Sequence, residues 1–356
     1  MDEETKQRCL IQLEKLIEIN KSLPKQRTPE WFKLREYKIT ASNVASCLKK
    51  NFTNCNSYIK EYGLEESFEK SENKYCNTYS SETEFILQKK NYIKFEGNKA
   101  CDWGTKYEPV ATMFYERYKN YTVLDFSLIP HPTIDIIAAS PDGICKENGT
   151  MLEIKCPMNR KIDGKPPIYY FQQMQTQLEC CDLEYCDYLE CVIKEYASID
   201  KLNEFGDELT IHDKHEHNKT ISPFTKGLTV TIGTPTYNKV LYPPHKFLTL
   251  EEQIEWAEKK KEKYKVLNVT VMFYKIHEIT LTSVKRDRNW FKIILPQLYR
   301  TAEKLKTFDP ILYQKDINRY NKTGSVIVFN PIEEQFGTKC LLITDEEINM
   351  KKRKKK

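Results

Sequence analysis

The sequence predicts a mixed α/β fold. Two short apolar runs flank Asn148-Gly149, a dipeptide typical of tight β-hairpins because both central residues of a type I′ turn need positive φ. Apolar residues also recur at helical spacing on both sides of this hairpin, over residues 104–118 and 169–181, and a β-rich run follows at 185–193. The resulting order of helix, strand, strand, helix and strand is that of a mixed α/β core.

The N-terminal part is expected to be helical. Leucine and isoleucine recur at helical spacing within residues 4–21, which predicts an amphipathic helix. Thr28 is a candidate N-cap for a second helix, with Pro29 at its first position. Residues 52–95 are polar and give only fragmentary helical signals, so we expect a variable lobe or loop there.

A last core strand is expected at residues 274–284. Residues from about 197 to 268 look like an insertion into the core before this strand. Within this insertion, Thr249-x-x-Glu252 is a capping box that predicts a charged helix through Lys265. Three histidines suggest a metal site, but their charged neighbours favour a solvated loop instead. These histidines are His212, His215 and His217.

The composition bounds the class of protein. A chain of 356 residues with 40% hydrophobic content can bury a sizeable core, as one elaborated domain or as a core with an inserted lobe. No apolar run approaches the roughly 18 residues that span a bilayer, and the N-terminus is acidic, so we expect a soluble, intracellular protein. The 12 cysteines lack paired C-x-x-C spacing, which favours free, mostly buried thiols in a reducing compartment.

The positive charge is unevenly distributed. The net charge is +5, and the six basic residues Lys351 to Lys356 leave the rest of the chain near neutral. This balance is weak support for nucleic-acid binding. The basic run itself has three interpretations, namely a solvated tail, a DNA tether or a nuclear-import signal.

The hairpin carries the most specific chemistry. With Asn148-Gly149 as its loop, position 144 faces 153 and position 142 faces 155, which places Asp142, Glu153 and Lys155 on one face. Asp142 and Glu153 are then diagonal neighbours, with Cα atoms roughly 7–8 Å apart, a separation that a cation can bridge. Their oxygens favour Mg²⁺ or Mn²⁺. In isolation these residues would more often be solvated, but Ser-Pro before the Asp and Cys-Pro after the Lys favour a site.

Several blocks of the chain, in order, resemble the phage lambda exonuclease and YqaJ-type viral recombinase family of PD-(D/E)xK nucleases. The resemblance covers about residues 28–195, and residues 278–305 resemble the closing strand and helix of that family. The loop between the Asp and the Glu is one residue longer than in the lambda enzyme. The blocks are Trp31 to Arg35 with Ile39 to Ser42, Trp103 to Glu108, Ser140 to Gly143, Leu152 to Pro157 and Tyr170 to Gln175.

The resemblance implies a PD-(D/E)xK restriction-endonuclease-like core with flanking helices and an inserted lobe. It makes Asp142 and Glu153 the principal metal ligands, Glu108 a third acidic residue at the metal centre, and the Ile154 carbonyl an extra ligand. Glu108 also has a structural explanation, since Thr105-x-x-Glu108 fits a capping box. Lys155 would orient or deprotonate the attacking water beside two Mg²⁺ ions, with Mn²⁺ expected to substitute.

By the same resemblance, a second set of residues would form a pocket for a terminal 5′-phosphate: Arg35, Ser42, Ser140 and Gln173. A guanidinium fork with hydroxyl and amide donors suits the extra negative charge of a terminal phosphate. A helix expected to begin near Ala41 would also offer free amides to an anion. The alternatives are that Ser42 is only an N-cap and Arg35 only a surface pairing residue.

The sequence therefore predicts a Mg²⁺-dependent exonuclease that degrades duplex DNA from 5′ ends, releases 5′-phosphorylated nucleotides and serves viral recombination or genome processing. A structure-directed or nicking endonuclease with the same metal centre is the alternative enzyme. A non-catalytic DNA-binding or assembly protein is the alternative of another class, and the intact set of acidic residues and lysine argues against it. The bias towards Lys, Asn, Ile and Tyr fits an AT-rich large DNA virus.

The expected partners are double-stranded DNA with free ends, a single-strand annealing protein and, by resemblance, two further copies of the chain in a trimer. No membrane partner is expected, and the location would be the host cytoplasm or nucleus. The expected organisation is an N-terminal helix (1–27), a nuclease core (28–195), an insertion (196–270), the closing strand and helix (271–308) and a C-terminal extension with the basic tail (309–356).

Overall fold

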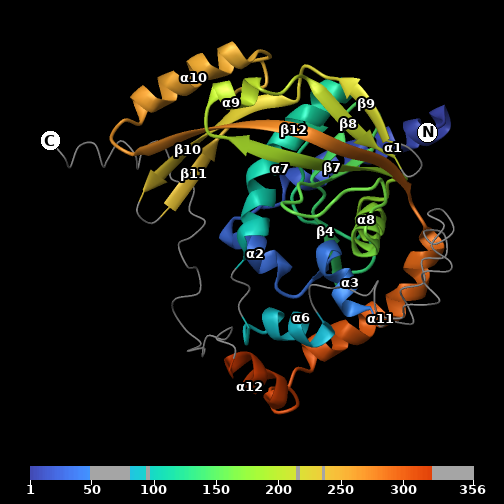
Figure 1. Ribbon diagram of the computed structural model, residues 1–356. Helices are drawn as coiled ribbons and strands as arrows, with labels where there is room; N and C mark the ends of the chain where they lie inside the picture. Colours follow the sequence, from blue (N-terminus) through green and yellow to red (C-terminus); the bar gives the residue numbers. More distant parts are fainter. Residues whose placement is uncertain (49–80, 94–96, 214–216, 235–236, 323–356) are drawn as a thin grey trace. The chain divides into compact units, whose positions relative to one another are not determined.

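The computed structural model describes residues 1–48, 81–93, 97–213, 217–234 and 237–322, which form two compact units (Figure 1). Of the described residues, the first unit comprises those within Met1–Val192, Thr210–Thr220 and 278–322, and the second comprises those within Ile193–Leu209 and Ile221–His277. The basic tail and most of the polar segment 52–95 lie outside the described residues.

The helical elements are α1 (Glu3–Lys21), α2 (Pro29–Arg35), the 3₁₀ turn η1 (Ala41–Asn43), α3 (Val44–Cys47), α6 (Glu82–Lys89), α7 (Lys99–Lys119), α8 (Ile168–Cys181), α9 (Ile199–Asn203), α10 (Leu250–Lys263), α11 (Arg288–Lys306) and α12 (Gln314–Lys322). The strands are β1 (Ile39–Thr40), β2 (Val123–Leu124), β3 (Ile129–Pro130), β4 (Ile137–Ala139), β5 (Gly143–Cys145), β6 (Met151–Lys155), β7 (Tyr185–Tyr196), β8 (Glu208–His212), β9 (His217–Ile221), β10 (Lys226–Thr234), β11 (Tyr237–Leu241) and β12 (Asn268–Lys285).

The two N-terminal helices begin where the sequence predicts. The Asp2 side chain accepts a hydrogen bond from the Thr5 amide at 2.8 Å and caps α1, which buries its apolar stripe in the core. Thr28 likewise accepts from the Trp31 amide at 3.3 Å and caps α2. Both helix predictions are confirmed.

Helix α7 begins earlier than predicted, at Lys99 instead of 104. The Asn98 side chain accepts from the Cys101 amide at 2.9 Å and provides the N-cap. Thr105 and Glu108 therefore lie inside the helix, and the capping-box explanation of Glu108 is wrong. The predicted apolar stripe is exposed at its last member, Tyr118, and buried at the other five positions, Tyr107, Val110, Ala111, Phe114 and Tyr115.

Strands β5 and β6 form the predicted hairpin in a different register. Ile144 pairs with Met151, and the Cys145 amide donates to the Thr150 carbonyl at 2.8 Å, so the loop spans 146–149 instead of two residues. The Asn148 side chain accepts from the Thr150 amide at 2.9 Å, and this local turn replaces the expected type I′ turn. The predicted pairings of 144 with 153 and of 142 with 155 are wrong. A shift of two residues keeps every side chain on its face, and it places position 142 opposite 153.

The crossover from β6 to β7 completes the predicted core order. β6 pairs parallel with β7 from Met151↔Cys186 to Lys155↔Glu190, and α8 connects the two strands. The order α7, β5, β6, α8, β7 confirms the mixed α/β prediction. Within the first unit, the C-terminal half of β12 lies beside β7, where the Thr280 hydroxyl donates to Glu190 at 3.1 Å.

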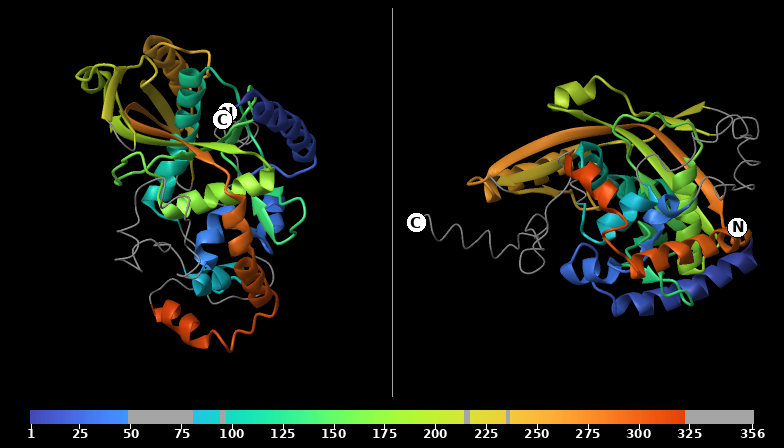
Figure 2. Two further views of the ribbon diagram at one scale, coloured as in Figure 1. Left: turned by 90° about the vertical axis from the view of Figure 1, so that its right-hand side faces the viewer. Right: turned by 90° about the horizontal axis from the view of Figure 1, so that it is seen from below.

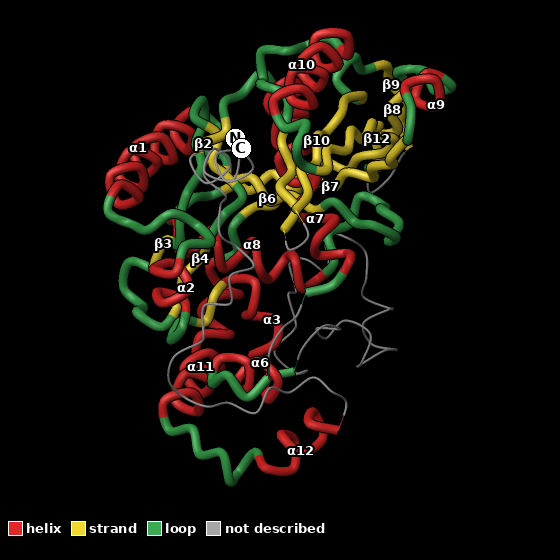
Figure 3. Tube along the Cα trace, turned by 90° about the vertical axis from the view of Figure 1, so that its left-hand side faces the viewer, coloured by secondary structure: helices red, strands yellow, loops and turns green. Residues whose placement is uncertain are grey.

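Helix α6 corrects the expectation of a lobe or loop for residues 82–89, the part of the segment 52–95 in which the structure describes a helix. Ser81 caps it by accepting from the Glu84 amide at 3.2 Å, and Phe85 and Ile86 are buried in the main core. Helices α3, α6 and α11 pack against one another, and α3 and α11 also pack on α8 (Figures 2 and 3). This short helix is therefore part of the core of the first unit.

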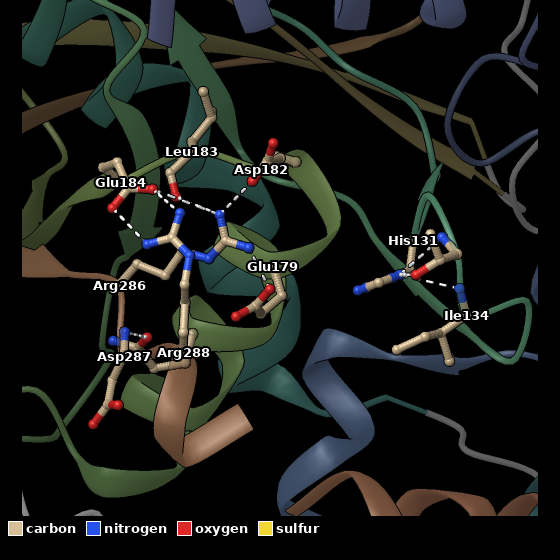
Figure 4. A network of polar contacts seen from close by, with 12 residues as sticks. His131, Ile134, Glu179, Asp182, Leu183, Glu184, Arg286, Asp287 and Arg288 are labelled. Carbon is tan, nitrogen blue, oxygen red and sulfur yellow. Dashed lines mark hydrogen bonds and ion pairs between the residues drawn. The ribbon is translucent and has the colours of Figure 1, made fainter. Parts of the chain in front are cut away.

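An ion-pair network joins the closing strand and helix to α8 and β7 (Figure 4). Arg286, at the end of β12, binds Glu179 and lies 2.6 Å from Asp182, while Arg288 binds Glu184. These contacts link residues more than 100 positions apart. They fix the junction between β12 and α11 to the end of α8.

The second unit contains α9 and a small sheet on which α10 packs. β10 pairs antiparallel with both β11 and the N-terminal half of β12, and α10 packs on β10. The capping box at Thr249 and Glu252 is present, as predicted. Among the described helices, none combines the length and the apolar character that a membrane crossing requires.

The expected solvated loop around the histidines is wrong for His212, which ends strand β8. Its Nε2 lies 2.6 Å from Glu278 Oε2, because β8 pairs parallel with β12 at this point. His217 begins β9, and His215 lies outside the described residues.

Candidate active site

Asp142 and Glu153 face each other at the open end of the β5–β6 hairpin. The Ile154 amide donates to Asp142 Oδ2 at 2.7 Å, so the backbone of β6 fixes the first carboxylate. Glu153 is completely buried. Burial raises the pKa of Asp142 well above its usual value, and the nearby Glu153 and Glu108 carboxylates raise it further.

Lys155 extends from the same strand face and binds Glu153. Its ammonium also lies 4.8 Å from the centroid of the Tyr170 ring on α8. Burial alone would lower the pKa of Lys155, but the attraction of Glu153 and Asp142 outweighs it and the pKa is raised. In the protein alone, Lys155 is therefore a charged donor held among acids.

Glu108 reaches this cluster from the middle of α7, which packs on β6. Burial raises its pKa and Glu153 contributes, while Arg27 and Lys155 oppose the shift. Glu108, Asp142, Glu153 and Lys155 thus influence one another electrostatically, although they come from a helix, a turn and a strand. The structure brings together the four residues that the sequence predicts as catalytic.

Two glutamines of α8 hold Glu153 in place. Gln173 Nε2 donates to Glu153 Oε1 at 2.7 Å, and Gln177 Nε2 donates to Oε2 at 2.7 Å. Gln173 was expected in the phosphate pocket, and here it contacts a predicted metal ligand. Gln177 was not predicted, although its spacing of four residues from Gln173 places both on one helix face and was a usable signal.

The predicted phosphate-binding residues are only partly connected by direct contacts. Arg35 Nη2 donates to Thr40 Oγ1 at 3.3 Å, and Thr40 Oγ1 lies 3.3 Å from Ser42 Oγ. The Ser140 hydroxyl is buried without a hydrogen-bond partner, and its carbonyl accepts from Gln177 at 3.3 Å. Thr40 is the unpredicted residue that links Arg35 to Ser42.

Another buried carboxylate, Glu190, lies beside the cluster, and it was not predicted from the sequence. Glu190 is opposite Lys155 in the register of β6 and β7, and it binds Arg160 and the Tyr188 hydroxyl. The Arg160 guanidinium lies 5.9 Å from the Tyr170 ring, the same ring that Lys155 approaches. No sequence spacing could reveal this pairing, because it depends on the parallel register.

The donor set fits a divalent cation. Three carboxyl groups share a buried region with one ammonium, and hard oxygen donors of this kind prefer Mg²⁺ or Mn²⁺. Across the described ranges, no three carboxylate, imidazole or thiol groups already converge as metal ligands do. A cation at Asp142 and Glu153 would therefore replace the contacts that Lys155 and Gln173 make to Glu153.

Comparison with known proteins gives matches of three kinds. Residues 30–184 match the family model of the YqaJ-like viral recombinase domain. An uncharacterised protein of Acanthamoeba polyphaga mimivirus is 30% identical over 288 residues, which are 68% of this chain and 51% of that protein. A protein of African swine fever virus (strain Badajoz 1971 Vero-adapted) is 26% identical over 198 residues, 47% of this chain and 49% of that protein.

The chain spans about half the length of the curated relatives it matches. Among solved structures, an alkaline exonuclease from Laribacter hongkongensis is similar with a TM-score of 0.40 and 21% identity, over 83% of this chain and 98% of that one. Both relatives come from large DNA viruses, and the matched segment contains all four residues of the charged cluster. Residues 30–184 of this chain are therefore a YqaJ-like viral recombinase domain.

Proposed function

We propose that this chain is a Mg²⁺-dependent DNA exonuclease that degrades duplex DNA from 5′ ends and releases 5′-phosphorylated nucleotides in viral recombination or genome processing. The observation that carries the proposal is the cluster of Glu108, Asp142, Glu153 and Lys155, in which Glu153 is buried and the other three are partly buried. Three acids around one lysine at a hairpin opening are suited to phosphodiester hydrolysis with a divalent cation.

The side chains have distinct roles in this proposal. Asp142 and Glu153 would hold the cations, with Glu108 and the Ile154 carbonyl completing the oxygen donors. When bound, two Mg²⁺ ions would supply an activated water and charge stabilisation for the leaving 3′ oxygen. Lys155 would orient that water, and it would act as a base once positive charge offsets the two carboxylates that raise its pKa.

The supporting contacts keep the carboxylates in fixed orientations. Gln173 and Gln177 hold the two oxygens of Glu153 separately, and the Ile154 amide holds Asp142. Ligands that are held by such partners lose less freedom when a metal binds. The site is therefore partly organised by α8 and β6 before any cation enters.

Recognition of a DNA end is assigned to Arg35, Ser42, Ser140 and Gln173. Arg35 is positioned by Thr40, and the unpartnered Ser140 hydroxyl offers a buried donor. In the same proposal, residues 28–195 with 271–308 form the nuclease core and 196–270 an insertion. A trimer and an annealing partner remain expectations from the resemblance.

The test compares two DNA substrates in one gel. We expect a 5′-end-labelled linear duplex to release labelled mononucleotide only when Mg²⁺ is added, because an exonuclease needs both an end and the cation. Covalently closed circular DNA should remain intact under the same conditions. Conversion of the circle to nicked or linear forms would establish the endonuclease alternative instead.

A control separates catalysis from contamination. The variant Asp142→Asn, purified identically, should bind the linear duplex without degrading it. Binding by the wild-type chain with no cleavage of either substrate, in Mg²⁺ or Mn²⁺, would establish the non-catalytic alternative.

A further inference from the structure

Helix α6 brings a second cation to Arg35. Lys89 is the last residue of α6, and its Nζ donates to the Arg35 carbonyl at 2.6 Å. The two residues are 54 positions apart. No spacing in the sequence pairs them, and Lys89 belongs to none of the blocks that carry the family resemblance.

No carboxylate contacts either cation in the part of the chain that the structure describes. Among the described residues, neither Arg35 nor Lys89 forms an ion pair. Burial lowers the pKa of Arg35 to about 10. Burial and the neighbouring Arg35 lower the pKa of Lys89 to about 8, while Cys47 and Glu36 oppose the shift only in part. Holding both positive charges here therefore costs free energy.

A purely structural explanation accounts for only one part of this arrangement. A lysine at the end of a helix is favourable because of the helix dipole, and one of its three N–H groups is used by the Arg35 carbonyl. A neutral donor would make the same bond without the repulsion. The Arg35 guanidinium uses one of its five donors, on Thr40. The Arg35 guanidinium also lies 4.3 Å from the centroid of the Trp31 ring, and the Lys89 ammonium lies 5.7 Å from that of Phe85. These ring contacts are weaker than an ion pair and use none of the remaining N–H donors, which are suited to an anion.

We propose that Lys89 and Arg35 form a two-cation site for a phosphate dianion, and that Lys89 is a specificity-determining residue for the terminal 5′-phosphate of DNA. The second half rests on the proposed function. A terminal phosphate carries about −1.5 to −2 charges near pH 7, whereas an internal phosphodiester carries one. A pair of cations distinguishes these two groups better than a single cation does.

Binding of inorganic phosphate to the whole chain tests the site without catalysis. We expect Lys89→Gln, which keeps an N–H donor for the Arg35 carbonyl but loses the charge, to weaken phosphate binding by about 10- to 100-fold at constant ionic strength. Lys89→Arg should retain most of the affinity. Lys90→Met is the matched control, since the neighbouring Lys90 lies over Phe308 and should leave the affinity unchanged.

Equal phosphate affinity in the wild type and Lys89→Gln, or no binding by the wild type, would overturn the two-cation site. A second neutral variant, Lys89→Met, keeps this test decisive if the Gln variant does not fold. The melting temperature of each variant is measured beside its affinity.

Cleavage of two matched duplexes, one with 5′-phosphate and one with 5′-hydroxyl ends, then tests the role in end recognition. The preference for 5′-phosphate should fall by about tenfold or more in Lys89→Gln and stay near wild type in Lys90→Met. Equal losses on both ends would overturn that role. If no variant and no wild-type sample cleaves DNA while phosphate binding behaves as expected, the proposed function fails and the anion site stands.

Discussion

At the scale of single residues, α8 divides its glutamines between two tasks. Gln173 and Gln177 lie on one face of the helix and hold Glu153, whereas Gln175 donates to the Lys285 carbonyl at 2.7 Å and accepts from the Asp287 amide at 2.6 Å. Gln173 and Gln177 are four residues apart, so their side chains lie on one face of the helix. Gln175 is two residues from each, so its side chain points to another face. One helix therefore orients Glu153, a predicted metal ligand, and anchors the closing strand.

Asp142→Asn should reduce cleavage by at least about 10²-fold, the lower range for losing a group that acts at the reacting atoms. The Asn oxygen can still accept from the Ile154 amide, so the hairpin and the affinity for DNA should be preserved. Single-turnover rates and equilibrium binding measure the two effects. Asp163→Asn is the control, because Asp163 is exposed and contacts only a neighbouring amide in the described contacts. More than a few per cent of residual activity would reject Asp142 as a metal ligand.

Gln177→Ala should raise the Mg²⁺ concentration needed for half-maximal cleavage by about 10- to 100-fold, as expected when a metal ligand loses its supporting partner. A titration of rate against Mg²⁺ measures this shift. Gln175→Ala is the informative comparison, since it should lower the melting temperature and leave the Mg²⁺ requirement unchanged. A shift of the same size in both variants would point to general loosening of α8.

At the scale of elements, the β5–β6 hairpin is fixed by contacts at both ends. Its turn packs against α1, where a side chain on Gly149 would meet Cys9, and its open end carries Asp142 and Glu153. The four-residue loop is held by the Asn148 side chain. The position of the acids thus depends on the turn as well as on the strands.

Gly149→Ala should destabilise the protein by at least about 1–2 kcal/mol, the cost of a left-handed backbone in a residue with a side chain. Gly149 has φ of 68°, and an added Cβ would lie 2.8 Å from Cys9 Cβ and 2.9 Å from the Cys9 carbonyl oxygen. Chemical denaturation measures the loss. Gly206→Ala should have little effect, because nothing lies within 4 Å of the added atom. Similar stabilities of the two variants would contradict the tight packing of α1 on the turn.

The ion-pair network at the junction of β12 and α11 predicts a pH dependence of stability. Burial raises the pKa of Glu184, but hydrogen bonds from Arg288 and Arg8 outweigh it, and the pKa is lowered. Because the folded pKa lies below the unfolded value, the contribution is complete above about pH 4.5 and is lost as pH falls through the folded value.

Glu184→Gln should therefore cost about 1–2 kcal/mol at pH 7, a value discounted because both arginines are about half exposed. The difference from the wild type should shrink as the pH falls below about 4.5, and it should vanish once Glu184 is protonated in the folded state, below its lowered pKa. Denaturation at a series of pH values gives this difference. Glu18→Gln removes an exposed pair with Lys21 and should show neither effect.

At the scale of the whole molecule, the fold class and the order of the core elements could be predicted, because helical periodicity and the hairpin are local signals. The register of the hairpin could not, because the loop spans four residues, within which the Asn148 side chain accepts a hydrogen bond from the Thr150 amide. Helix α6 and the strands β8 to β11 were missed, because their pairing depends on partners far along the chain. The four predicted catalytic residues converge. Thr40 and Lys89 contact Arg35 through hydrogen bonds that no spacing reveals, whereas the four-residue spacing of Gln173 and Gln177 was a usable signal.

Metal binding should be visible as stability of the whole chain. At Mg²⁺ concentrations ten times the dissociation constant, the folded state would gain about 1.4 kcal/mol, which raises the melting temperature by a few degrees. Asp142→Asn should show no such rise. Thermal unfolding with Mg²⁺, and with Ca²⁺ at equal ionic strength as a comparison, measures the effect. An identical rise in the wild type and in Asp142→Asn would mean that the cation binds elsewhere.

The hydrogen-bond partners of the two faces of α8 are synthesised at different times. The partner of Gln177 is 24 positions earlier in the chain, whereas the partner of Gln175 is 110 positions later. At about 5–20 residues per second, translation reaches the later partner roughly 5–20 s after Gln175. During that interval the nascent chain already contains the hairpin and α8 but lacks the closing strand and helix. Glu153 can therefore be positioned before the core is closed, while the face of α8 that carries Gln175 still lacks its partner.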